Sequence, residues 1–193
     1  MSEIRILLAD EDVRSRDILR KALDALDYLV IGEVADGSSV VSLTRQLLPD
    51  LVMMDAHVSH TSALVVAETL RNEHLAPIIM MAQHGDRELV EAAREVGVLG
   101  FLVKPIKKSE LLPTIEVIRA RWVEQHARRQ ELSQLRDKLE TRKVIERAKG
   151  YLMDSQGLQE AEAFRKIQRL AMNSRKTMRE VAQAILLAQQ LKH

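Results

Sequence analysis

The sequence has no cysteine among its 193 residues. A disulfide scaffold, a zinc site built on thiolates and a catalytic cysteine nucleophile are therefore excluded. Aromatic residues make up only 3% of the chain, which argues against nucleic-acid recognition built mainly on base stacking. Hydrophobic residues make up 46%, which predicts a folded chain with a real core.

The sequence also lacks a segment suited to a membrane. No stretch approaches the roughly 18 uninterrupted apolar residues of a membrane-spanning helix. The apolar run that begins at Ile4 is cut off by the acids Asp10, Glu11 and Asp12, too early for a signal peptide. The sequence thus predicts a cytoplasmic protein with no membrane partner.

The charges nearly cancel over the whole chain but not within its two halves. Overall, 29 Lys and Arg face 28 Asp and Glu, a net charge of +1. Residues 1–120 hold 13 Lys and Arg against 19 Asp and Glu, a net of −6, and residues 121–193 hold 16 against 9, a net of +7. Such asymmetry indicates an acidic site at one end and a polyanion partner at the other, although surface helices also drift in charge by chance.

Short apolar runs alternate with helical patterns over residues 1–120. Strands are expected at residues 4–9, 28–34, 51–54, 77–82 and 98–103, and helices at 12–26, 36–48, 62–73, 86–96 and from Ser109 onward. This alternation predicts an α/β domain with a doubly wound, five-stranded parallel sheet that is covered on both faces. In such sheets the functional crevice lies at the carboxyl ends of the strands.

The pattern changes after Leu111. Pro113 is tolerated only in the first helical turn, so a helix is expected to begin near Leu112, and no helix breaker follows before Gly150. Apolar residues recur every three or four positions, with a weak stretch at 125–129. The spacing predicts a coiled-coil helix over residues 112–141 that joins two copies into a homodimer. The alternative is one long amphipathic helix lying on its own domain.

Residues 142–193 show only helical patterns and predict a small all-α domain of three helices. A helix is expected at 160–172, and a last helix begins after the N-cap Thr177, with Glu180 completing a capping box, and ends near Leu191. The apolar residues expected to form the small core are Leu152, Met153, Phe164, Ile167, Leu170, Ala171 and Met172.

Charged side chains follow the ends of three of the predicted strands. Asp10 and Glu11 follow the first strand, Asp55 ends the third, and Lys104 follows the fifth. Neighbouring carboxylates repel unless a cation sits among them, and oxygen ligands of this kind suit Mg²⁺. Asp55 is then placed as a carboxylate nucleophile for a phosphoryl group, and Lys104 as a cation for the phosphoryl oxygens. A set of separately solvated acids is the weaker interpretation.

Three sequence blocks carry these residues: Ile6-Leu7-Leu8-Ala9-Asp10-Glu11-Asp12, Asp50-Leu51-Val52-Met53-Met54-Asp55 and Phe101-Leu102-Val103-Lys104-Pro105. Over about residues 3–120 the chain thereby resembles the response-regulator receiver domains, which have a flavodoxin-like fold. The resemblance implies that Asp55 is the phosphoacceptor, that Asp10 and Glu11 bind the metal, and that Lys104 contacts the phosphate. It also implies that the backbone carbonyl of His57 is a metal ligand and that a sensor kinase or sensor protein is a partner. No enzymatic turnover is implied beyond self-phosphorylation of Asp55.

Several positions depart from the receiver pattern. Glu11 stands where the family usually has Asp, and its extra methylene moves the ligand outward. Ala82 stands where a Thr or Ser usually hydrogen-bonds the phosphoryl group, and alanine has no such donor. The usual switch coupling to Phe101 is then impaired. The segment after Asp55 lacks the usual Met-Pro and the later Gly. The histidines near this edge are interpreted as surface or loop residues rather than metal ligands; they are His57, His60 and His84.

A second ordered set of residues lies in the helical tail. It comprises Arg142-Lys143-Val144-Ile145-Glu146-Arg147-Ala148-Lys149-Gly150-Tyr151-Leu152-Met153, Gly157, Glu160, Ala163-Phe164-Arg165, Leu170-Ala171-Met172 and Val181-Ala182. Residues 141–182 thereby resemble the ANTAR domain, the RNA-binding module of transcription antitermination regulators. The resemblance implies binding to paired hairpin loops of a nascent leader transcript. Such binding disfavours the terminator hairpin and lets transcription continue.

Basic and small side chains of this tail are the candidate RNA contacts. Basic clusters suit a phosphate backbone, Arg also stacks on or forks to an unpaired base, and small residues let RNA approach closely. The candidates are Arg142, Lys143, Ala148, Lys149, Gly150, Arg165, Arg169, Arg175 and Lys176. At least one basic side chain, Arg147 being the first candidate, is expected to pair instead with Glu146, Glu160 or Glu162.

Two other functions are open alternatives to the antitermination regulator. A DNA-binding response regulator needs a recognition helix in the major groove, and the turns at Gly157 and Asn173 do separate short helices. A degenerate receiver that docks a sensor protein is suggested by Ala82. The domains predicted in every case are a receiver at 1–120, a linker helix at 112–141 and a helical domain at 142–193.

Overall fold

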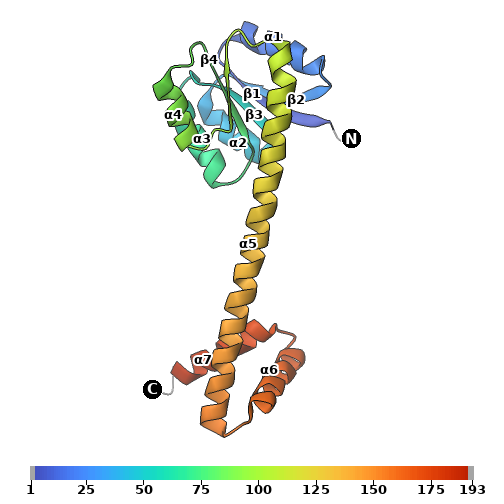
Figure 1. Ribbon diagram of the computed structural model, residues 1–193, viewed down its shortest axis with the longest axis vertical. Helices are drawn as coiled ribbons and strands as arrows, with labels where there is room; N and C mark the ends of the chain where they lie inside the picture. Colours follow the sequence, from blue (N-terminus) through green and yellow to red (C-terminus); the bar gives the residue numbers. More distant parts are fainter. Residues whose placement is uncertain (1–2, 191–193) are drawn as a thin grey trace. The chain divides into compact units, whose positions relative to one another are not determined.

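A computed structural model describes residues 3–190, and Figure 1 shows the course of the chain. The chain divides into two compact units, Met1–Gln125 and His126–His193, and helix α5 contributes residues to both. Leu191, where the last helix was expected to end, lies outside the described residues. Among residues 3–190, no helix is both long and apolar enough to cross a membrane.

The first unit is built on a sheet of five parallel strands (Figure 1). The strands are β1 (Ile4–Ala9), β2 (Tyr28–Val34), β3 (Leu51–Asp55), β4 (Ile78–Ala82) and β5 (Gly100–Val103), in the order β2-β1-β3-β4-β5. The predicted doubly wound sheet is confirmed. Strand β5 begins two residues later than expected, because the N–H of Val98 still donates to the Ala93 carbonyl at the end of the preceding helix, at 2.9 Å.

Helices cover both faces of this sheet. Helix α1 (Val13–Asp24) and the first part of α5 (Lys108–Gln156) pack on one face, where Ile6 and Leu8 point. Helices α2 (Gly37–Leu47), α3 (Ala63–Asn72) and α4 (Arg87–Glu95) pack on the other, where Leu7 and Ala9 point. Successive side chains of a strand alternate between faces, so a sheet buried on both sides needs the continuous apolar runs seen in the sequence.

A buried tyrosine links β2 to α5 within the first unit. The Tyr28 hydroxyl donates to Glu116 at 2.9 Å, and burial together with this carboxylate raises the pKa of Tyr28 to about 12. An unfolded tyrosine loses its proton near pH 10, so between about pH 10 and 12 the free energy of unfolding should fall as pH rises.

Tyr28→Phe tests this pH dependence. The variant should lose less stability over that pH range than the wild type in urea unfolding followed by circular dichroism. The pKa of Lys104 is also raised, so deprotonation of Lys104 lowers the free energy of unfolding at high pH as well. The fall of the free energy of unfolding with pH should therefore become shallower in Tyr28→Phe without vanishing. An identical pH slope in the two proteins would contradict the account.

Helix α5 differs from its predicted bounds at both ends. It begins at Lys108, one residue before the start expected from Ser109 and four before the start expected from Pro113, and it runs past Gly150 to Gln156. Pro113 therefore lies inside the helix, where it removes the hydrogen bond to the carbonyl four residues earlier. Leu111, Ile115 and Ile118 are buried against the sheet, and their packing offsets that loss. The helix ends at Gln156 and is followed by Gly157, whose φ of +64° favours glycine.

The apolar seam of α5 divides between two environments. Ile115 and Ile118, counted with the seam in the sequence, belong to the core of the first unit. Further along the helix the seam is exposed, at 55% for Leu132, 50% for Leu135 and 58% for Leu139. These three side chains form what we call the leucine stripe, and it lies entirely within the second unit.

The second unit packs the end of α5 against α6 (Glu160–Ser174) and α7 (Met178–Gln190). The predicted capping box of α7 is present: the Thr177 N–H donates to the Glu180 carboxylate at 2.7 Å, and the Glu180 N–H donates to the Thr177 hydroxyl at 3.2 Å. The core of the unit contains the buried residues Ala148, Leu152, Ala163, Ile167, Ala171, Val181 and Ala182.

The predicted core of this unit was partly wrong. Leu152, Ile167 and Ala171 are buried, but the other four predicted core residues are exposed: Met153, Phe164, Leu170 and Met172. The buried side of α6 is the single stripe Ala163, Ile167 and Ala171, spaced four residues apart, so the apolar side chains beside that stripe stay at the surface.

Ile167→Ala should destabilise the second unit by about 2–5 kcal/mol, because it removes methylene groups from a fully buried site and leaves a cavity. Hydrogen exchange of the amides of α6 and α7 measures this locally in the full chain. Met172→Ala, at a site that is 74% exposed on the same helix, is the matched control and should change exchange little. Equal protection of Ile167→Ala and the control would contradict the assignment of this core.

Candidate functional sites

The carboxyl ends of β1, β3 and β5 meet at one edge of the sheet and border a hollow of about 440 Å³. The parallel arrangement brings these ends together because each strand runs in the same direction. Four of the lining residues were predicted from the sequence as site side chains, Asp10, Glu11, Asp55 and Lys104, and the others are Asp12, His57, Gln83 and His84.

Lys104 lies between the two buried aspartates at this edge. Its Nζ is 2.6 Å from Asp10 Oδ2 and also forms a close ion pair with Asp55 Oδ2. The three side chains are nearly inaccessible, at 11%, 3% and 7% exposed. Burial by itself lowers the pKa of Lys104, but the hydrogen bonds to both carboxylates outweigh it and the pKa is raised. The ammonium group is therefore charged at neutral pH and holds the two carboxylates together.

Further hydrogen bonds fix the orientation of each aspartate. Asp10 Oδ2 accepts from the Ser15 hydroxyl at 2.7 Å, and Asp10 Oδ1 accepts from the N–H of Asp12 at 3.0 Å. Asp55 Oδ1 accepts from the N–H of His57 at 2.6 Å. Ser15 was missed in the sequence, where the only available signal is a hydroxyl in the first turn of the helix that follows the acids.

The oxygen groups at this edge fit a magnesium ion in kind. Mg²⁺ takes one or two carboxylates and completes its shell with water, and Asp10 and Asp55 supply two carboxylates that already share one cation. Glu11 is exposed, and within residues 3–190 no three acid or histidine side chains gather closely enough to hold a metal. The side chain of His57 is 76% exposed, and His60 and His84 are exposed as well, which confirms the interpretation of the three histidines as surface residues.

Ala82 ends β4 directly beside this site. It is 1% exposed, and its carbonyl accepts from the N–H of Lys104 at 2.8 Å. The backbone of Ala82 therefore helps to position Lys104, while its methyl side chain offers no hydrogen-bond donor. Phe101, on β5, is partly buried against the core that α2, α3 and α4 cover.

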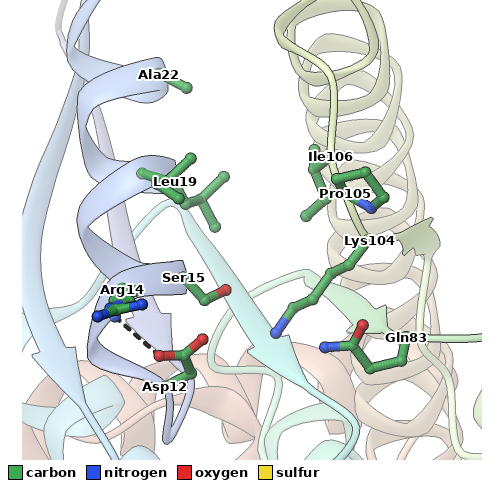
Figure 2. Close-up of a pocket in the computed structure, with 10 residues that line it drawn as sticks. Asp12, Arg14, Ser15, Leu19, Ala22, Gln83, Lys104, Pro105 and Ile106 are labelled. Atoms are coloured by element: carbon green, nitrogen blue, oxygen red, sulfur yellow. Dashed lines mark hydrogen bonds between the residues drawn. The ribbon is translucent and has the colours of Figure 1, made fainter.

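A second hollow, of about 310 Å³, lies beside the first between α1 and the segment after β5. Figure 2 shows Lys104 and Gln83 pointing toward α1 across this hollow, with Ser15 and Leu19 opposite. Its walls are mostly apolar, and they include the exposed side chain of Ile18. The charged site thus has an apolar neighbour along α1.

In the second unit, the predicted RNA contacts fall into two groups. One group is exposed: Arg142, Lys143, Arg165, Arg169, Arg175 and Lys176. Lys143 pairs with Glu140 at 2.9 Å, whereas the other five form no ion pair within residues 3–190. We call these five residues the free cations, and they are the part of the predicted set that is available to a polyanion.

The other predicted contacts are buried or have no close neighbour. Lys149 is only 6% exposed, and its Nζ binds Glu146 at 2.9 Å and Glu160 at 2.7 Å, which raises its pKa. The expected pairing of a basic side chain with these glutamates is thus present, with Lys149 in place of Arg147. Ala148 is buried in the core, and a Cβ on Gly150 would meet no described atom within 4 Å beyond the adjoining backbone of its own helix. Lys149 and Glu146 lie on α5, and Glu160 is the first residue of α6. The ion pair between Lys149 and Glu160 therefore joins α5 to the start of α6.

The sheet, its buried aspartates and the lysine between them define a receiver, and the helical unit adds an output module. Residues 6–116 match the family model described as the response regulator receiver domain, and residues 133–186 match that of the ANTAR domain. The chain therefore belongs to the response regulators that carry a receiver domain and an ANTAR domain.

Individual proteins agree with this assignment. The transcriptional regulatory protein PdtaR of Mycobacterium tuberculosis is 38% identical over 182 residues, which are 94% of this chain and 89% of the relative. The DNA-binding response regulator MtrA of Mycolicibacterium paratuberculosis is 31% identical over 113 residues, 58% of this chain and 49% of that protein.

Among solved structures, the CheX-CheY-BeF3-Mg complex from Borrelia burgdorferi is similar in fold. Its TM-score is 0.55 at 20% identity, over 60% of this chain and 88% of the solved chain. This likeness shows the fold alone.

Proposed function

We propose that this chain is a response regulator that binds hairpin RNA through its ANTAR domain and thereby causes transcription antitermination. The receiver controls this output, through phosphorylation of Asp55 or through docking of a sensor protein. The proposed domains are the receiver at 1–120, the linker helix at 112–141 and the ANTAR domain at 142–193. The observation that carries the RNA assignment is the set of free cations on a domain whose family binds RNA.

The proposed chemistry of the receiver follows from the site at the sheet edge. A carboxylate oxygen of Asp55 attacks the phosphorus of a donor, an acyl phosphate forms, and the leaving group of the donor departs. Lys104 neutralises the phosphoryl oxygens and has to release part of its contact with Asp55 for this purpose. The pairing with Asp10 keeps the ammonium group in place while it does so.

Mg²⁺ is the proposed cofactor, as receiver domains generally bind this ion. Asp10, Asp55, the backbone carbonyl of His57 and the more distant Glu11 are the residues that would hold it. When bound, the ion supplies positive charge that offsets the repulsion between the carboxylates and the incoming phosphoryl group. Ala82 offers no hydroxyl to that group, and we propose that docking of a sensor protein takes a larger share of the control for this reason.

The proposed contacts to RNA are Arg142, Arg165, Arg169, Arg175 and Lys176. Lys143 is a further contact once it exchanges its partner Glu140 for a phosphate. Gly150 provides a place for close approach of the RNA backbone. Ala148 and Lys149 act from beneath this surface, the first in the core and the second in its ion pairs with Glu146 and Glu160.

The DNA-binding alternative has less support. The similarity to the DNA-binding regulator MtrA spans about the length of the receiver, whereas the similarity to PdtaR continues through the ANTAR domain. A shared receiver says nothing about the output, because the same receiver fold is joined to different output domains.

Crosslinking of the protein to cellular RNA, followed by sequencing, tests the proposed function. Recovered RNA should be enriched in leader transcripts with neighbouring hairpins. The double variant Arg165→Ala/Arg169→Ala, which removes two free cations from one helix face, is the control and should lose that enrichment. Equal recovery by both proteins, or no enrichment of hairpins, would refute the proposal.

A further inference from the structure

Phe164 is an exposed aromatic residue in a domain that has few of them. Its side chain is 41% exposed on α6, although the sequence predicted it in the core. It borders a hollow of about 390 Å³ whose other walls come from α5. Those walls are Ile145, Thr141, Lys138, Arg142, Asp137 and Glu146.

The charges around this hollow are not balanced. Asp137 is 3.8 Å from Arg179, and Glu146 is bound by Lys149 at 2.9 Å, so both acids have partners within the protein. Lys138 and Arg142 are exposed and form no ion pair with any residue the structure describes. The hollow therefore combines an apolar floor of Phe164 and Ile145 with a rim of two available cations.

We propose that this hollow receives one unpaired nucleobase of an RNA hairpin loop. The base packs on Phe164 and Ile145, and Arg142 and Lys138 meet the phosphates on either side. The ring suits this role because every base has a π-face, and cations beside the ring match the charge of the backbone. This inference rests on the proposed RNA-binding function and names the residue that recognises the loop.

A second copy of the chain is the other occupant to be considered. The leucine stripe is where two copies are expected to meet. With 3.6 residues per turn, the stripe formed by Lys138, Thr141 and Ile145 is turned roughly 120° from it around α5. Arg142 and Glu146 continue the spacing of the leucine stripe and form the edge of the hollow nearest to it, whereas the apolar part of the hollow, at Ile145 and Phe164, lies on a different side of α5. Pairing through the leucine stripe therefore leaves that apolar part open to RNA.

The test uses the full chain and a pool of synthetic RNAs that contain two neighbouring hairpins with randomised loops. The wild-type protein selects a binding RNA, and 2-aminopurine then replaces each loop base in turn. Phe164→Leu keeps an apolar side chain but removes the aromatic face, and Phe164→Trp restores it. Leu170→Ala is the matched control, at a site on the same helix that is 42% exposed and does not border the hollow.

Phe164→Leu should weaken RNA binding by about 5- to 150-fold, the range for loss of one stacked base. One loop position should show 2-aminopurine quenching with the wild type and with Phe164→Trp, but not with Phe164→Leu. Leu170→Ala should bind and quench like the wild type. Circular dichroism and sedimentation confirm that each variant keeps its fold and oligomeric state.

Three results would overturn the inference. Selection of no RNA by the wild type would remove both the inference and the proposed function. Unchanged affinity and quenching in Phe164→Leu would remove the inference alone. A change of oligomeric state in Phe164→Leu would show that a second copy, rather than RNA, covers this face.

Discussion

Asp55→Asn is expected to abolish phosphorylation of the chain by a small phosphodonor in the presence of Mg²⁺. The wild type should gain one phosphoryl group by intact-mass measurement, since Asp55 is the acid whose carboxylate lies beside both Lys104 and the backbone of His57. An amide cannot act as the attacking carboxylate, so the adduct should vanish rather than decrease. Removal of Mg²⁺ with a chelator should suppress the adduct in the wild type.

The control for this experiment is another acid that follows a strand. Asp36 accepts from the N–H of Ser39 at 3.0 Å as the N-cap of α2, and Asn can replace Asp in that role. Asp36→Asn should therefore be phosphorylated like the wild type. An adduct that persists in Asp55→Asn would place the phosphoryl group on a different residue and refute the assignment of the acceptor.

The second large effect is expected from the leucine stripe. Three leucines that are at least 50% exposed and spaced three and four residues apart match the seam of a coiled coil. Replacing Leu132, Leu135 and Leu139 together with Glu should convert a dimer to a monomer in sedimentation experiments. Under the proposed function, affinity for an RNA with two neighbouring hairpins should then fall by about 100-fold or more, because a monomer offers one ANTAR domain to the two hairpins and loses the avidity of two.

A control triple variant separates the stripe from its added charge. Gln130, Ser133 and Gln134 lie on other sides of α5 and are exposed, so Glu at these three positions adds the same charge away from the stripe. This control should remain dimeric. If both triple variants dissociate into monomers, the added negative charge, and not loss of the leucines, causes the dissociation. If neither does, the leucine stripe is not the dimer interface.

Much of the receiver could be predicted from the sequence because its signals are local. Runs such as Ile6 to Ala9 are buried on both faces, and Asp36 or Gly157 mark the ends of helices through their own chemistry. Parallel pairing then brings Asp10, Asp55 and Lys104 to one edge without further information. Ser15 was missed because a hydroxyl in a first helical turn has many other uses.

The second unit was harder to predict because its packing depends on which side chains find a neighbour. Phe164, Leu170 and Met172 read as core residues by their apolarity, yet a three-helix unit covers only one stripe of α6. Lys149 reads as a surface cation, yet Glu160 from the next helix holds it in the interior. The start of α5 was misplaced for a related reason, since the packing of Leu111 on the sheet outweighs one hydrogen bond lost at Pro113.

Binding to hairpin RNA and to duplex DNA at matched salt tests whether the chain acts on RNA through its ANTAR domain. The RNA is a two-hairpin leader transcript recovered by crosslinking, and the duplex has the same length and a related sequence. We expect tighter binding to the RNA, a preference that survives when salt is raised, and loss of that binding in Arg165→Ala/Arg169→Ala. Equal or tighter binding to the duplex, with no preference for hairpins, would contradict it.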